Sequence, residues 1–505
     1  MFIYYQNHKR MKKKSFIIQS LTLIVSLGFF FSCNENEFST EVINNNIANS
    51  KISMTQAEFI SIAFDDTNNE LSEDEISAYV KDFNPNAHAQ TRNSSAITNI
   101  KISNKYYVSN NANTRADGNL SVPFYEVKFQ CNGTDGQAIV SGDKRSPGII
   151  AYIEKDGSGV EAYTGKRYML EIAQQSTISD IENVIYIQDS LREKTINKIA
   201  LELGISPQKV DLEKIRNNIY ITDQTITRSP AYDRPLSAVV DSKGPFIEVK
   251  WGQSVPYNMH LPFCSEEFIQ YFWDENGNLT VTTEYRRRNR PTGCGVTAIA
   301  EALTYLKPAI TINGINMDWV LLTQDANLTY SPWDSQPDET QYPQANMAAT
   351  LVKYIYEQTN TTPKYGNKNP AYKSESDDPV VLSSSTGKSN IKSFLQIYSN
   401  LNEYNKWAPD EILASVMSGH IAMILGCSSK DKSKSHAWII DGYAQCVKTS
   451  RTILKQYDLY FHANMGWDGI DDGFYRFNSD STIDFKTDSG TFDSQFSVFA
   501  NIRKK

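Results

Sequence analysis

Residues 291–306, which read PTGCGVTAIAEALTYL, decide the fold of the second half of the chain. Glycines flank Cys294, and apolar residues then recur at helical spacing until Pro308, which cannot continue a helix. We therefore predict a tight turn and then a mostly buried helix that begins at Cys294. The helix dipole would stabilise a thiolate and lower the pKa of the thiol. Gly293 and Gly295 would let a substrate backbone approach the sulfur. A buried structural cysteine is the alternative interpretation.

A second segment, residues 435–443 with the sequence SHAWIIDGY, predicts an apolar strand with a histidine at its start. In that position His436 is placed to take a proton from a thiol across a cleft. It follows Cys294 by 142 residues, and in papain-type enzymes the histidine and asparagine follow the cysteine by ~130–150 residues. The alternative is a core or surface histidine without a chemical role.

Two further segments place amides near such a pair. Residues 462–469, HANMGWDG, carry Asn464, whose carbonyl would hold the imidazole in its useful tautomer, and Trp467, which would exclude water. The same segment is typical of a glycine-rich hairpin between strands at 457–462 and 473–477, and both interpretations can hold together. Residues 251–258, WGQSVPYN, carry Gln253, whose amide would join the backbone N–H of Cys294 in stabilising an oxyanion.

In this order the four segments resemble the streptopain family of papain-like cysteine peptidases, and residues 139–147, IVSGDKRSP, are similar to a motif in its propeptide. The resemblance implies an α+β fold. A papain-like catalytic domain has two lobes, one with the cysteine helix and one with a twisted antiparallel sheet, and an α+β inhibitory prodomain precedes it. Gly295 and Met465 depart from the pattern of the family, and Met465 would loosen the packing beside the histidine. The implied site residues are the nucleophile Cys294, the base His436, the oxyanion donor Gln253, the orienting Asn464, and Gly293, Gly295, Trp438 and Trp467 along the substrate cleft.

The first thirty-three residues predict an export signal. Lys12-Lys13-Lys14 precede an apolar run over residues 16–31, and Cys33 follows as the residue that a lipid would modify. A plain signal peptide and a short membrane anchor are the alternatives. We expect an exported bacterial lipoprotein of the outer membrane or cell surface, with the mature peptidase released. The predicted divisions are a signal (1–33), a tether (34–50), a propeptide (51–222) in which residues 55–58 form a helix-capping box, a linker with the maturation cut (223–247) and a catalytic domain (248–505).

Composition limits the remaining function classes. The chain has 505 residues, a net charge of −8 and no basic stripe, so a nucleic-acid partner is not expected. None of the six cysteines forms a C-x-x-C pair, so a structural zinc site is not expected either, while one or two disulfides remain open. We predict a secreted cysteine endopeptidase made as a zymogen, which acts on proteins or peptides without metal or organic cofactor and is inhibited by its own propeptide. An inactive, peptidase-like surface binding module and a Cys-His amidase or acyl transferase are the alternatives.

Overall fold

The computed structural model describes most of the chain from residue 51 onward. The signal (1–33) with Cys33, the tether (34–50) and the larger part of the expected linker lie outside the described residues. In the described part of the chain, no helix is both long and apolar enough to cross a membrane. Within 51–505 the residues left out of the description are 65–67, 84, 86–96, 110–119, 132, 156–163, 216–217, 223–238, 274–278, 369–376, 428–434, 448–456, 478–485, 488–489 and 492–495.

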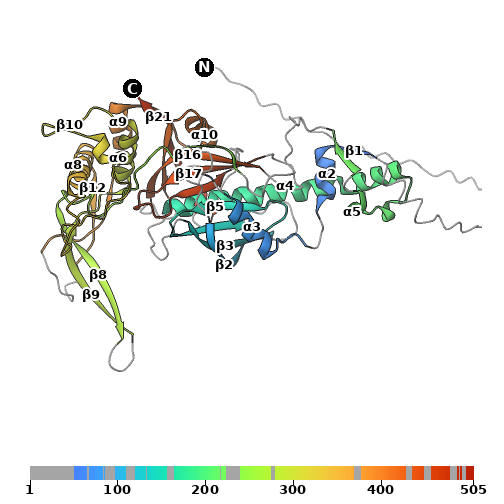
Figure 1. Cartoon of the computed structure of the whole chain (residues 1–505), viewed down its shortest axis with the longest axis horizontal. Helices are drawn as coiled ribbons and strands as arrows, with labels where there is room; N and C mark the ends of the chain where they lie inside the picture. Colours follow the sequence, from blue (N-terminus) through green and yellow to red (C-terminus); the bar gives the residue numbers. More distant parts are fainter. Residues whose placement is uncertain are drawn as a thin grey trace, which may run out of the picture. The chain divides into compact units, whose positions relative to one another are not determined.

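An antiparallel sheet of eleven strands is the central element of the fold (Figure 1). Its strands are β2 (Ile97–Ser109), β3 (Ser121–Cys131), β4 (Thr134–Ser141), β5 (Gly148–Ile153), β7 (Val239–Lys243), β14 (Ser399–Tyr404), β15 (Ile421–Cys427), β16 (Ser435–Val447), β17 (Tyr457–Asn464), β18 (Gly473–Phe477) and β21 (Phe496–Lys504). They follow the order β14-β21-β15-β16-β17-β18-β5-β4-β3-β2, and β7 pairs with β16. Because β18 pairs with β5, strands from both sides of the expected linker share one sheet.

The predicted hairpin of residues 457–477 is confirmed, since β17 and β18 pair through Phe461 and Tyr475. Part of the expected linker is not a linker, because Val239–Lys243 forms β7 along the edge of β16. Just beyond β7, the backbone N–H of Phe246 donates to Asp441 O at 2.9 Å. The polar and proline-rich composition of 223–247 hid this strand. Val239–Lys243 therefore belongs to the sheet, and residues 223–238 of the expected linker lie outside the described residues.

The cysteine-bearing helix α6 (Cys294–Leu306) begins and ends where the sequence predicts. It packs on α8 (Tyr342–Gln358) and α9 (Lys388–Tyr398), and its other side contacts β16. Lys307 ends the helix in a left-handed conformation with φ +47° and donates its N–H to Leu303 O. The cysteine is thus set between a group of helices and the sheet.

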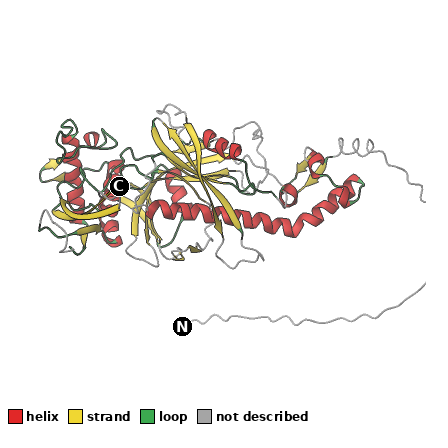
Figure 2. Cartoon of the chain, turned by 90° about the horizontal axis from the view of Figure 1, so that it is seen from below, coloured by secondary structure: helices red, strands yellow, loops and turns green. Residues whose placement is uncertain are grey.

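The helix α4 (Thr164–Leu203) has 40 residues and is the longest in the described part of the chain (Figure 2). Its first half packs on β5, β16 and β18. There the ring of Tyr168 stacks on Trp438, with ring centroids 6.1 Å apart and ring planes 17° apart. This helix, which comes from the expected propeptide, therefore lies directly against the strand that carries His436.

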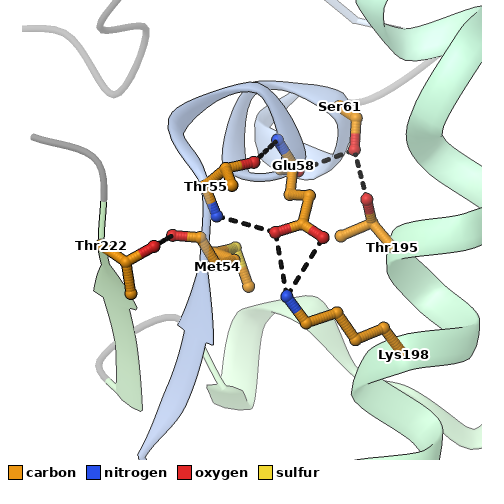
Figure 3. A network of polar contacts seen from close by, with 7 residues as sticks. All are labelled: Met54, Thr55, Glu58, Ser61, Thr195, Lys198 and Thr222. Carbon is orange, nitrogen blue, oxygen red and sulfur yellow. Dashed lines mark hydrogen bonds and ion pairs between the residues drawn. The ribbon is translucent and has the colours of Figure 1, made fainter.

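The second half of α4 binds the first described residues of the chain (Figure 3). The strand β1 (Ile52–Met54) runs parallel to β6 (Ile219–Ile221), and α2 (Gln56–Ala63) packs on α4. The predicted capping box is confirmed, because Thr55 and Glu58 each accept the backbone N–H of the other. Glu58 also pairs with Lys198 of α4 at 2.9 Å. Both ends of the expected propeptide are therefore held at the same place.

The other elements complete a mixture of helices and strands, in agreement with the predicted α+β class. They are α3 (Glu73–Asp82), η1 (Pro207–Lys209), α5 (Leu212–Ile215), α7 (Trp319–Leu322), α10 (Pro409–Met417), β8 (Phe263–Trp273), β9 (Leu279–Asn289), β10 (Thr311–Ile312), β11 (Ile315–Asn316), β12 (Thr362–Tyr365), β13 (Val381–Ser385), β19 (Lys486–Thr487) and β20 (Gly490–Thr491).

Candidate active site

The turn before α6 places Cys294 at the helix N-terminus. Gly293 adopts φ +84°, and a Cβ there would lie 2.5 Å from Ser384 O, so this position requires glycine. The sulfur accepts backbone N–H groups from Ala437, Gly295 and Cys294 itself. Burial nevertheless raises the pKa of the Cys294 thiol above its usual value. The expected lowering is therefore wrong for this arrangement, because loss of solvent outweighs the helix N-terminus and its donors.

His436 is the second residue of β16 and is buried. Its imidazole is stacked between Trp467 and Trp438, with ring centroids 5.6 and 6.0 Å away. The imidazole Nε2 lies 2.9 Å from Met465 O. Since a carbonyl can only accept, Nε2 carries the proton and donates it to this bond. Burial lowers the pKa of His436 to about 4, so the ring is neutral near pH 7.

The nucleophile and base candidates come from elements that touch, because the sulfur of Cys294 accepts the N–H of the residue after His436. The imidazole Nε2, however, is directed to Met465 O rather than to the sulfur. The first turn of α4 lies over the ring, and a Cβ on Gly165 would be 2.7 Å from His436 Cδ2 and 3.3 Å from its Nε2. Residues of the expected propeptide thus cover the base.

Gln253 is bonded to the turn that precedes Cys294. Its backbone carbonyl accepts the N–H of Thr292 at 3.1 Å, which ties the segment to the turn that leads into α6. Its side-chain Nε2 is buried and has no hydrogen-bond partner among the described residues. A buried amide donor without a partner is costly in a folded protein, and a substrate oxygen that accepts from it would remove that cost.

Asn464 binds backbone rather than the imidazole in this structure. Its Oδ1 accepts the N–H of Gly466 at 3.0 Å, and its Nδ2 donates to Val249 O at 3.2 Å. Met465, which lies between Asn464 and Gly466 in the chain, is buried and supplies the carbonyl to which His436 donates. Asn464 therefore shapes the turn that holds the imidazole, and a direct contact with the ring remains a prediction.

The remaining expected cleft residues are placed in different surroundings. Trp467 is partly buried and stacks on His436, whereas Trp438 is fully buried between β16 and α4. Gly295 faces Thr386 and Ile391, which a Cβ would approach to 3.0 and 3.1 Å. Trp438 thus packs behind the imidazole.

Sequence reasoning missed a pair of buried acids behind the site, Glu301 and Asp472. Glu301 Oε1 accepts the N–H of Trp251 at 2.9 Å, and Asp472 Oδ1 accepts the N–H of Met465 at 2.7 Å. Burial raises the pKa of Asp472 to about 6. A glutamate inside the apolar run of residues 296–303 was the signal that could have revealed the first of them. In the described residues, no group of three or more His, Cys, Asp or Glu side chains could hold a metal ion.

Comparison with known proteins gives one family. The model of the peptidase C10 family matches residues 251–475, a region that contains all four segments singled out in the sequence. No curated protein matches the chain. Among solved structures, a fragment of prointerpain A from Prevotella intermedia is similar, at 15% identity, with 80% of this chain and 100% of that chain covered and a TM-score of 0.38.

Proposed function

We propose that this chain, whose residues 251–475 match the model of the peptidase C10 family, is the inactive precursor of a cysteine endopeptidase that hydrolyses peptide bonds in proteins. The observation that carries the proposal is the meeting of α6 and β16. The thiol of Cys294 accepts the N–H of Ala437, so the sulfur lies beside the strand residue that follows His436. A thiol beside a general base is the arrangement that activates a cysteine for acyl transfer.

In the active form, the proton of the Cys294 thiol passes to His436, and the thiolate attacks the peptide carbonyl. The Gln253 amide and the backbone N–H of Cys294 would stabilise the oxyanion, and the unpartnered Nε2 of Gln253 supports this role. As the C–N bond breaks, His436 gives its proton to the leaving amine and a thioester forms. Water, deprotonated by His436, then hydrolyses the thioester and the thiol is restored.

The described arrangement supports latency. The Nε2 proton of His436 is bonded to Met465 O, so the neutral imidazole can take up a thiol proton only at Nδ1. Desolvation raises the pKa of the half-buried Cys294 thiol, so the thiol stays protonated near pH 7. Gly165 of α4 closes over the imidazole. We therefore assign residues 51–222 as an inhibitory propeptide, and place the maturation cut within residues 223–238, before β7.

Export belongs to the same proposal. The apolar run at 16–31 and the cysteine at position 33 favour a lipoprotein of the outer membrane or cell surface. The lipid would tether the propeptide, and a cut before residue 239 would separate the tether from the catalytic region in the covalent chain.

The proposal is tested by activity and labelling together. Residues 34–505 are produced, treated with a small amount of an external protease, and tested for hydrolysis of a quenched fluorescent protein and for labelling by a thiol-directed epoxide. We expect both activities in the wild type and neither in Cys294→Ala. Labelling without protein hydrolysis would favour an amidase or acyl transferase, and a processed chain that does neither would favour a binding module.

A further inference from the structure

We infer that Asp468 is a specificity-determining residue, whose carboxylate binds a lysine or arginine of the substrate just after the peptide bond that is cut. The inference rests on the proposed function and deepens it, because it names the class of peptide bond that the same site would prefer. Asp468 is half-buried and follows Trp467, whose ring stacks on His436. Its carboxyl is therefore set close to the reacting groups.

The carboxyl of Asp468 lies against the segment that carries Gln253. It occupies the space into which a Cβ on Gly252 would project, and the backbone N–H of Asp468 donates to Trp251 O at 3.2 Å. Asp468 adopts φ +55°, a left-handed conformation that aspartate tolerates better than most residues. Backbone conformation and hydrogen bond together hold the carboxyl beside the residue that precedes the proposed oxyanion donor.

The path of the substrate past this carboxyl follows from the proposed mechanism. The oxyanion would point to Gln253 and to the N–H of Cys294, while His436 gives its proton to the leaving amine. The substrate chain that continues from this amine therefore leaves on the side of His436 and of the Trp467 ring stacked on it. Asp468 is the next residue, so its carboxyl faces the first two substrate residues after the cut.

In the precursor, a cation of the proposed propeptide already lies at this place. Lys155 Nζ donates to the backbone O of Asp468 at 3.1 Å, and its positive charge acts on the carboxyl. The propeptide is bound along the same turn, since Lys155 O accepts the N–H of Asp471 at 3.0 Å. An ammonium group therefore fits beside Asp468, and departure of the propeptide would leave the place to a basic side chain of the substrate.

Stability alone does not account for an acid at position 468. Burial raises the pKa of Asp468 to about 6, and among the residues that the structure describes no hydrogen bond to its carboxyl opposes this. At pH 7.5 the group is ionised but poorly stabilised, whereas an asparagine of the same size would carry no charge to desolvate. A residue whose charge costs stability beside an active site is explained if that charge binds substrate.

Lys250 is the cation of the catalytic region that could compete with the substrate. Its side chain lies beside Gly469, its ammonium pairs with Glu154 at 3.2 Å, and its charge acts on Asp472. A preference for basic substrates in the mature enzyme therefore requires Lys250 to stay with Asp472.

The test is a specificity profile of the chain 34–505, activated by an external protease that is then inhibited. An unfolded protein is digested at pH 7.5, and its cut sites are identified by mass spectrometry. From a frequent site, peptides are made with lysine, glutamine or glutamate at the first or the second position after the cut. kcat/KM is measured for wild type, Asp468→Asn, Asp468→Lys and the control Glu357→Gln, which removes an exposed negative charge from α8.

We expect wild type and Glu357→Gln to favour lysine over glutamate by about fivefold or more at one of the two positions. An ion pair forms with the first peptide, and like charges meet with the second. Asp468→Asn should reduce this ratio to about twofold or less, and Asp468→Lys should reverse it. The ratio does not depend on the fraction of each variant that is folded, so lost stability cannot imitate the effect.

An active wild type without this preference at either position overturns the inference and leaves the proposed function standing. So does a preference that survives in Asp468→Asn, because the carboxylate would then not be its cause. Should Asp468→Lys not fold, the Asn variant alone decides. An inactive wild type would contradict the proposed function itself, and this inference with it.

Discussion

Enlarging Gly165 should accelerate the activation of the precursor. A Cβ at this position would lie 2.7 Å from His436 Cδ2 and 2.8 Å from Met465 Sδ, about 1 Å inside the usual contact distance. The imidazole is stacked between two tryptophans and has little room to move. Such overpacking costs about 1–3 kcal/mol, and the better helix propensity of alanine offsets roughly 1 kcal/mol of it.

In Gly165→Ala, a net strain of about 0–2 kcal/mol destabilises only the closed state, in which Gly165 lies over His436. The population of the open state, in which α4 has moved off the imidazole, should therefore rise by up to about thirtyfold. Valine adds methyl groups and has a poorer helix propensity than alanine, so its effect should be larger. The assay is the rate at which dilute precursor is cut, followed by intact mass. Arg167→Ala, an exposed change in the same helical turn, is the control. A folded Gly165→Val precursor that is cut at or below the wild-type rate would refute the account of latency.

Three further predictions concern stability. Arg476 is buried and lies 2.9 Å from Asp458. Asp458→Ala should lower the free energy of unfolding by about 3–5 kcal/mol, because it leaves part of a buried charge unpaired. A loss below about 1 kcal/mol in denaturant unfolding would contradict this. Burial raises the pKa of Asp468 to about 6, so the ionised carboxylate destabilises the fold above that pH. Asp468→Asn should therefore raise the melting temperature at pH 7.5 and leave it unchanged at pH 4. An equal shift at both pH values would show that ionisation of Asp468 is not the cause. Glu58→Ala removes half of the capping box and the pair with Lys198, so hydrogen exchange in β1 and β6 should rise by the equivalent of about 1 kcal/mol while exchange in β16 stays unchanged.

The local features of the fold could be predicted from the sequence. The helix α6 is bounded by glycine and proline, the strands β17 and β18 flank a glycine-rich turn, and the capping box at Thr55 is a short motif. Each of these depends on residues close together in the chain. The resemblance to a known family rests on the same local segments.

What the sequence could not predict depends on contacts between distant residues. The pairing of β5 with β18 joins residues more than 300 positions apart, and no periodicity encodes such a partner. The same holds for Gly165 over His436. The pKa of the Cys294 thiol was predicted from the helix dipole alone, but the sign was decided by burial. Glu301 was visible as an acid in an apolar helix, yet Trp251, whose N–H its carboxyl accepts, lies on another segment.

The central claim, that Cys294 cuts peptide bonds and that residues 51–222 keep it latent, is tested most directly by an intact-mass time course. Residues 34–505 and the Cys294→Ala variant are incubated side by side under reducing conditions. The account predicts that the wild type converts to a fragment that begins between residues 223 and 239, while the variant stays whole. Loss of the same segment at the same rate from Cys294→Ala would contradict it, because the cut would then not depend on the thiol.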